Sequence, residues 1–149
     1  MSFSSDSTAQ RHAEGLILEA VAQKVGVSLH PRSLNLVSGA VVDIDGVADD
    51  ESVLVEIFAH QGQLKGGQRH KIAGDALKLI TIARERNPPP TLILAFGDPD
   101  ILRFFAGKSW LAAAINAWGI RIVVAELDVT ARDEIRVAQA RQVMVNASE

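Results

Sequence analysis

The sequence has no cysteine, no tyrosine, two tryptophans and five phenylalanines. The absence of cysteine excludes disulfides, thiolate zinc ligands and a thiol nucleophile. With so few aromatic side chains, the chain is poorly supplied with the stacking surfaces that bind single-stranded nucleic acid. No apolar run reaches the roughly 18 residues of a membrane-spanning helix, and the N-terminus lacks the pattern of a secretory signal. We therefore expect a cytoplasmic protein that does not contact membranes.

An excess of positive charge is also missing, because 15 Lys and Arg stand against 18 Asp and Glu, for a net charge of -3. A protein that reads DNA over a large surface is usually basic, so any contact with nucleic acid is expected to be local. The 149 residues, of which 48% are apolar and 22% charged, are typical of one soluble domain. A mean hydropathy of +0.15 leaves apolar surface to cover and favours a homodimer.

The spacing of apolar residues divides the chain into helices and strands. Helices are predicted over Ala13–Val25, Gln68–Arg86, 99–118 and 130–143, and strands over 34–36, 40–47, 52–60, Thr91–Phe96 and 120–127. The first two strands form a hairpin that turns at Ser38-Gly39, and the third strand continues the meander. This order, αβββαβαβα, predicts a single α/β domain over residues 1–149, with a mixed five-stranded sheet flanked by helices. Residues 1–12 and 146–149 are expected to be flexible.

Two of the predicted strands carry a carboxylate among apolar neighbours. Asp45 follows Val42 and Ile44, and Glu56 lies within Val53–Phe58. An ionised carboxylate buried in a sheet costs several kcal/mol unless it is paired, hydrogen-bonded or bound to a metal. Folding alone does not explain two such residues on neighbouring strands, so we take them as a candidate site.

The predicted strand register brings these two carboxylates together. Side chains alternate along a strand, so Asp45 is expected to share a face with Asp43 and Val47. Across an antiparallel pair, Asp45 and Glu56 would lie opposite each other, about 5 Å apart, which suits one Mg²⁺ or Mn²⁺ ion with water in its other positions. Such an ion lowers the pKa of bound water and stabilises a pentavalent phosphate. This is the chemistry of a metal-dependent nuclease.

The order of elements around these acids resembles a known group. A leading helix, a three-strand meander with Asp45 on its second strand and Glu56 on its third, and then a helix and a strand resemble the core of the PD-(D/E)xK, or restriction-endonuclease-like, superfamily over roughly residues 13–96. The resemblance implies that fold, a Mg²⁺-dependent nuclease and a metal site at Asp45 and Glu56. It also implies a third acid from the first helix, which matches Glu19 or, as the alternative, Glu14. Phe58 stands where the motif has its lysine.

In that superfamily a basic group from a nearby element sometimes replaces the motif lysine. This chain offers Lys65 in the preceding loop, and Lys71 and Lys78 on the second predicted helix with Asp75 on the same flank. His60, beyond the motif on the third strand, is a further candidate proton carrier or metal ligand. Shorter strings are similar to a group of small actinobacterial proteins; they are residues 45–47, 55–62, 64–68 and 75–79.

The loop before the second predicted helix is rich in glycine and in basic residues. Lys65, Arg69, His70 and Lys71 lie in or beside it, together with three glycines. Such a loop can approach a phosphodiester backbone with both amides and cations, so Lys65 and Arg69 are candidate substrate-binding residues. A loop that only connects a strand to a helix is equally consistent with this composition.

The two acids also have structural interpretations. Asp45, which precedes a glycine, is consistent with a strand-end residue that bonds its own turn. Glu56 is consistent with an ion pair to Lys71 or Lys78. The alternative function is therefore a non-catalytic binding or assembly module that retains the nuclease-like fold.

Two further features lie in the second half of the chain. The carboxyl ends of the last two strands, at Phe96-Gly97 and Leu127-Asp128, are consistent with a small-molecule site of a doubly wound sheet, although no glycine fingerprint is present. Trp110 and Trp118 fall near the same face of the third predicted helix. We expect these two residues in the core or at a dimer contact.

Overall fold

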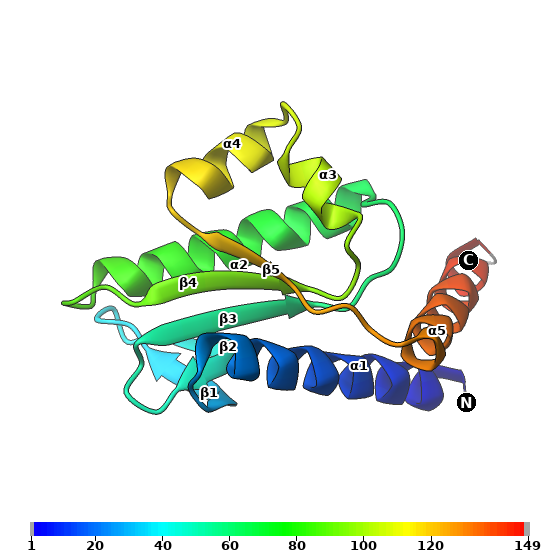
Figure 1. Cartoon of the computed structure of the whole chain (residues 1–149), viewed down its shortest axis with the longest axis horizontal. Helices are drawn as coiled ribbons and strands as arrows, with labels where there is room; N and C mark the ends of the chain where they lie inside the picture. Colours follow the sequence, from blue (N-terminus) through cyan, green and yellow to red (C-terminus); the bar gives the residue numbers. More distant parts are fainter. Residues whose placement is uncertain (1, 148–149) are drawn as a thin grey trace.

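The five strands form one sheet, and their order across the sheet follows their order in the chain (Figure 1). In this computed structural model they are β1 (Leu29–Asn35), β2 (Val41–Ala48), β3 (Val53–Phe58), β4 (Thr91–Phe96) and β5 (Arg121–Val124). The pairs β1–β2 and β2–β3 are antiparallel, whereas β3–β4 and β4–β5 are parallel. The structure describes residues 2–147, and the side chains of residues 7–147. The prediction of an α/β fold with a mixed five-stranded sheet is confirmed.

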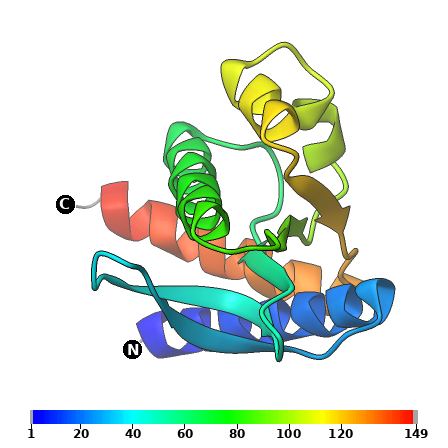
Figure 2. The ribbon, with the colours of Figure 1, turned by 90° about the vertical axis from the view of Figure 1, so that its left-hand side faces the viewer.

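Helices cover both faces of this sheet. They are α1 (Ser2–Val25), α2 (Gly66–Arg84), α3 (Ile101–Phe105), α4 (Trp110–Ala117) and α5 (Val129–Ala147). The α1 and α5 helices pack together on one face, and α2 lies on the other face with α3 and α4 (Figures 1 and 2). None of the helices within residues 2–147 has the length and apolarity needed to cross a bilayer.

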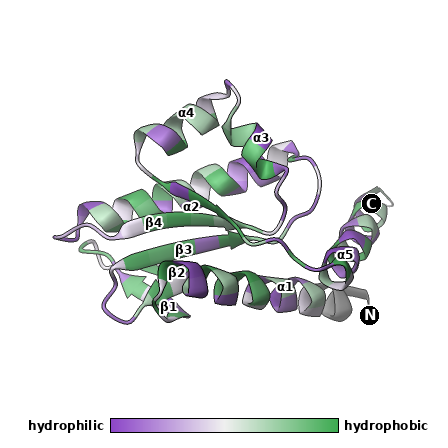
Figure 3. Ribbon diagram, viewed as in Figure 1, coloured by the Kyte–Doolittle hydropathy of each residue, from purple (hydrophilic) through white to green (hydrophobic). Residues whose placement is uncertain are grey.

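The strands β3 and β4 are apolar on both faces because helices cover both. Leu54 and Leu94 are fully buried on the α2 side, and Val55 and Ile93 are fully buried on the α1 side. Burial of an aliphatic side chain of this kind contributes roughly 1.5–3 kcal/mol to folding. The strands are green over most of their length in Figure 3, with one hydrophilic interruption in β3. Glu56 is the only charged residue of that strand.

The terminal helices are longer than predicted. The α1 helix begins at Ser2 instead of Ala13, because its first turns are mostly polar and lack the apolar spacing on which the prediction depended. The α5 helix continues to Ala147. Residues 2–12 and 146–147, which were expected to be flexible, are therefore helical, and residues 1, 148 and 149 lie outside the described part of the chain.

The single helix predicted over 99–118 is wrong, because two helices occupy this segment. The α3 helix ends at Phe105, and at Gly107 a Cβ would lie only 3.1 Å from the carbonyl oxygen of Phe104. Ser109 then caps α4, since its hydroxyl oxygen accepts a hydrogen bond from the N–H of Ala112 at 3.1 Å. The apolar spacing continues across the break, so the sequence pattern predicted one continuous helix.

Two tryptophans at the ends of α4 face the solvent. Trp110 is 72% exposed and Trp118 is 56% exposed, so the interpretation of either residue as part of the core is wrong. A contact of these residues with a second copy of the chain stays a prediction.

Candidate functional site

The ladder between β2 and β3 is short. Its partners are Gly46 with Val55 and Val47 with Leu54. The next two residues along the strands are Asp45 and Glu56, and they do not continue the ladder. We call this point the β2–β3 opening.

Both acids use their side chains to bond the backbone at the β2–β3 opening. The Oδ2 atom of Asp45 accepts a hydrogen bond from the N–H of Ile57 at 2.9 Å. The Oε1 atom of Glu56 accepts one from the N–H of Asp45, at 3.4 Å. Each carboxylate therefore contacts the opposite strand, and the two acids converge where a ladder pair would otherwise form.

The strict alternation of side chains predicted along β2 is wrong. Ile44 and Val47 are three residues apart, yet both are buried in the core on the α2 side, so the alternation of side chains breaks between them. The register with β1 explains the break, because two residues of β2 stand opposite Pro31 alone. This arrangement is a β-bulge, and proline has no N–H to offer to a regular ladder. The bulge therefore lies at Asp45 and Gly46, next to the β2–β3 opening.

Lys78 of α2 provides a cation at the β2–β3 opening. Its Nζ atom lies 3.3 Å from Oε1 of Glu56 and 3.8 Å from Oδ1 of Asp75. The same ammonium donates a hydrogen bond to the carbonyl oxygen of Asp43 at 2.8 Å. The side chain of Asp43 accepts from the hydroxyl of Ser33 and is exposed. The ion pair that the sequence offered for Glu56 is therefore formed with Lys78.

Burial has the largest effect on the acids of this cluster. Burial raises the pKa of Glu56 to about 8; the negative charge of Asp45 acts in the same direction, and Lys78 opposes it. Burial also raises the pKa of Asp75 and the pKa of Glu14. The negative charge of Asp45 acts in the same direction on both residues. Glu56 therefore releases its proton, and gains a fully charged ion pair with Lys78, only as the pH rises toward 8.

Glu14, and not Glu19, is the acid of α1 that lies within electrostatic reach of Asp45. The side chain of Glu14 is half-buried and accepts a hydrogen bond from Nε2 of Gln10 at 3.1 Å. Glu19 is exposed and has no ion pair or side-chain hydrogen bond within the described residues. On a helical wheel Glu14 lies about 60° from the buried Ile17 and Glu19 about 160° from it, so the sequence did contain this signal.

A cation lies over Phe58, the residue that replaces the lysine of the motif. The Nζ atom of Lys71 is 5.7 Å from the centroid of the Phe58 ring, within the range of a cation–π contact. The charge of Lys71 also lowers the pKa of Glu14 and of Asp75. Lys71 and Lys78 thus approach the acids from α2.

The cluster has more negative than positive groups. Glu14, Asp45, Glu56 and Asp75 outnumber the two lysines by two when all are ionised. Among the residues that the structure describes, no group of three or more His, Asp or Glu side chains is arranged to hold a metal ion. The predicted set that included Glu19 is therefore not formed. Two carboxylates remain, and Mg²⁺ commonly takes one or two from a protein.

The remaining predicted site residues lie outside the acid cluster. The Nε2 atom of His60 is 3.2 Å from a backbone carbonyl oxygen of the following loop. Lys65 is exposed and immediately precedes α2. The guanidinium of Arg69 lies 5.4 Å from the ring centroid of Phe104 in α3. The basic loop of the prediction thus faces α3 and the solvent, and only Lys71 reaches the acids.

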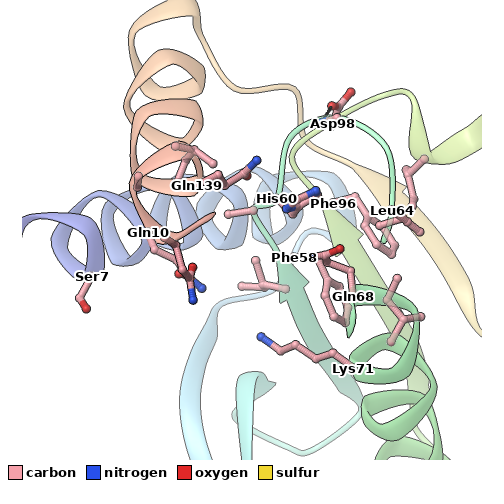
Figure 4. A pocket seen from close by; sticks show the side chains of 18 of the residues that line it. Ser7, Gln10, Phe58, His60, Leu64, Gln68, Lys71, Phe96, Asp98 and Gln139 are labelled. Atoms are coloured by element: carbon pink, nitrogen blue, oxygen red, sulfur yellow. Dashed lines mark hydrogen bonds between the residues drawn. The ribbon is translucent and has the colours of Figure 1, made fainter. Parts of the chain in front are cut away.

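A pocket of about 420 Å³ lies next to the acid cluster, where β3 and β4 end (Figure 4). Its walls come from α1, α2, α5 and the ends of both strands. Ile57 and Lys71 belong both to the pocket and to the surroundings of the acids. The strand-end rule pointed to Phe96, which lines the pocket, but nothing in the sequence indicated the wall from α5.

Comparisons with family models, curated proteins and solved structures returned no match to this chain. Its function is therefore inferred from the acids at the β2–β3 opening, the two lysines of α2 and the adjoining pocket.

Proposed function

We propose that the protein is a Mg²⁺- or Mn²⁺-dependent phosphodiesterase that acts on nucleic acid, with a variant PD-(D/E)xK site on a restriction-endonuclease-like fold. The observation that carries the proposal is the convergence of Asp45 and Glu56 beside Lys78. Phosphodiester hydrolysis needs oxygen ligands for a divalent ion and cations that stabilise the charge of the phosphate. Both kinds of group meet at the β2–β3 opening.

The donor set fits a divalent cation. Asp45 and Glu56 offer hard oxygen ligands, and the cluster has two negative charges in excess when every carboxyl group is ionised. Because the pKa of Glu56 is about 8, this residue must release its proton before it can act as a ligand. When bound, the ion supplies an acidified water and neutralises charge that develops on the phosphate.

Lys71 and Lys78 of α2 provide the positive charge that the motif lysine would otherwise supply. Lys78 holds Glu56 through an ion pair at 3.3 Å. If Glu56 held a metal ion, the ammonium of Lys78 would be free to bind a phosphate oxygen. Lys71 lies over Phe58 and orients the attacking water or stabilises the phosphate.

Hydrolysis assays test this proposal directly. Wild-type protein with Mg²⁺ or Mn²⁺ is expected to cleave DNA or RNA, and Asp45→Asn is expected to lower the rate at least about 100-fold because a ligand charge is lost. Glu19→Gln is the matched control, since Glu19 is exposed and outside the cluster. An Asp45→Asn variant as active as the wild type would contradict the proposal.

Metal binding provides a test that needs no substrate. A cation that binds only the folded protein raises Tm, and the rise is expected to grow between about pH 6 and about pH 9 because Glu56 loses its proton in this range. The variant Glu56→Gln is expected to remove most of the Mn²⁺-dependent rise and its pH dependence. A rise in Tm that is independent of pH, or that survives in Glu56→Gln, would place the ion elsewhere.

The second candidate function is a non-catalytic binding or assembly module that retains the nuclease-like fold. The ion pair between Glu56 and Lys78 favours it, because a structural pair would already occupy the acid. This function predicts no effect of Mg²⁺ or Mn²⁺ on Tm and no hydrolysis of any nucleic acid.

A further inference from the structure

The pocket beside the acids lies at the carboxyl ends of the parallel strands β3 and β4. The edge formed by the carboxyl ends of parallel strands is where open α/β sheets bind their ligands. In Figure 4, Gln10 and Gln139 stand on one side of the pocket, Gln68 and Lys71 on the other, and Phe58 lies between them. A volume of about 420 Å³ falls within the roughly 300–1,000 Å³ of small-molecule pockets.

The pocket adjoins the acid cluster through two residues, Ile57 and Lys71. The side chain of Ile57 lines the pocket, and its backbone N–H bonds Asp45 at 2.9 Å. Lys71 extends from α2 at the boundary, and its charge acts on Glu14 and Asp75. A molecule that fills the pocket therefore contacts Ile57, the residue that is hydrogen-bonded to Asp45.

The walls of the pocket suit an uncharged polar ligand better than a phosphate. Among the residues that the structure describes, Lys71 is the only Lys or Arg that lines it, whereas a phosphate site draws on several cations. Four glutamines line the pocket, at positions 10, 68, 139 and 142. Three of these amides already have partners: Gln139 bonds the backbone of Gln61, Gln10 donates to Glu14, and Gln68 accepts from the N–H of Lys65. Gln142 has no hydrogen bond within the described residues. A free amide can both donate to and accept from the edge of a nucleobase.

Asp98, an acidic residue that lines the pocket, already has hydrogen-bond partners for its carboxylate. Both oxygens of Asp98 accept hydrogen bonds from backbone N–H groups, of Gly62 at 2.7 Å and of Asp100 at 3.0 Å. The rings of Phe58 and Phe96 are stacked with centroids 5.0 Å apart and contribute an apolar wall. An apolar wall beside a free amide, that of Gln142, can receive a base removed from its stack.

We propose that this pocket holds one unpaired nucleobase, whose adjoining phosphate lies at Asp45 and Glu56, and that the substrate is nucleic acid with a single-stranded end or loop. The inference depends on the proposed nuclease function for the position of the phosphate. A paired base presents only its groove edges and remains stacked, so the enclosing walls from α1, α2 and α5 select against an intact duplex.

Binding of uncharged nucleosides tests the proposal separately from catalysis. Adenosine, guanosine, cytidine and uridine are titrated into the full chain, with ribose 5-phosphate as the probe that carries a phosphate and no base. At about ten times its Kd, a bound nucleoside is expected to raise Tm by about 3–6 °C and to show saturation transfer by NMR. Ribose 5-phosphate is expected to do neither.

Two variants locate the nucleoside. Ala138→Phe fills the pocket from α5, and Gln142→Leu removes the free amide at an exposed position, where substitutions usually change stability little. Both are expected to weaken nucleoside binding at least about 10-fold while the Mn²⁺-dependent rise in Tm is unchanged. Asp45→Asn is expected to abolish the Mn²⁺ effect and to keep nucleoside binding.

The outcomes separate the two proposals. Nucleoside binding that is lost in Ala138→Phe or Gln142→Leu and kept in Asp45→Asn supports the base pocket, even if no hydrolysis is found and the nuclease proposal fails. Binding of ribose 5-phosphate without any nucleoside, or nucleoside binding that neither pocket variant changes, overturns it. Cleavage of duplex at the same rate as single strands also counts against it.

Discussion

The two edges of β3 differ in how they are paired. Along β4, every residue from Val53 to Phe58 has a partner in one continuous parallel register. Along β2, the ladder stops before Glu56, and side-chain oxygens bond the backbone in its place. One edge stabilises the sheet, and the other keeps a buried acid whose pKa is raised to about 8. Departures from local folding rules of this kind are expected at functional positions.

The largest effect is expected from a break in the parallel edge. Ile93 of β4 is completely buried, and Ile93→Ala is expected to lower the free energy of unfolding by about 3 kcal/mol through lost burial and a cavity. Urea unfolding measures the change. Thr91→Ala in the same strand is the control, because Thr91 is exposed and should change the free energy by less than about 0.5 kcal/mol. If Ile93→Ala lowered the free energy of unfolding by less than about 1 kcal/mol, the β3–β4 edge would not be the more stable edge of β3.

A smaller effect of opposite sign is expected at the β2–β3 opening. The pKa of Glu56 is raised from 4.5 to about 8 in the folded protein, so the folded state binds a proton that the unfolded state has released. Stability from this group is complete below about pH 4.5 and is lost as the pH rises toward 8. Glu56→Gln mimics the protonated acid and is expected to raise the free energy of unfolding by about 2 kcal/mol at pH 7 in the absence of metal.

The pH series distinguishes this effect from a general one. Urea unfolding at about pH 5, 7 and 9 should show the gain from Glu56→Gln increasing with pH. Glu19→Gln, at an exposed position of α1, should change nothing at any pH. A Glu56→Gln variant less stable than the wild type at pH 9 would show that the ion pair with Lys78 outweighs burial.

The smallest effect is expected at the bulge of β2. A Cβ on Gly46 would lie 2.5 Å from Cδ1 of Leu18, the flexible end of an α1 side chain, so Gly46→Ala is expected to lower the free energy of unfolding by about 1 kcal/mol. Gly15→Ala is the matched control, because Gly15 has open space around it in α1 and alanine favours the helix by about 0.5–1 kcal/mol. Thermal unfolding measures the stability change in each variant. Changes of the same sign in Gly46→Ala and Gly15→Ala would contradict the close packing of α1 on the bulge.

The parallel edge could be predicted from the sequence because its signal is local. The apolar run Thr91–Phe96 and the apolar spacing of α2 each identify one element without reference to any other. The break between α3 and α4 could not be predicted, because the apolar spacing continues through Gly107 and only the chain geometry there ends the helix. The first turns of α1 were missed for the opposite reason, since they are polar and still helical.

The candidate site could be predicted only in part. The positions of Asp45 and Glu56 on consecutive strands were enough to expect their approach. The bulge that directs Asp45 depends on Pro31 of a different strand, so no pattern within β2 reveals it. Which lysine pairs with Glu56 depends on the rotation of α2 against the sheet, and this rotation is set by tertiary packing.

The helices α1 and α5 lie at opposite ends of the described chain, and both form walls of the pocket (Figure 4). Contacts between segments so distant in sequence close the largest loops and tend to form late in folding. The β2–β3 opening, in contrast, needs only a hairpin and its neighbour. A nascent chain can therefore bring Asp45 and Glu56 together before α5 completes the wall of the pocket.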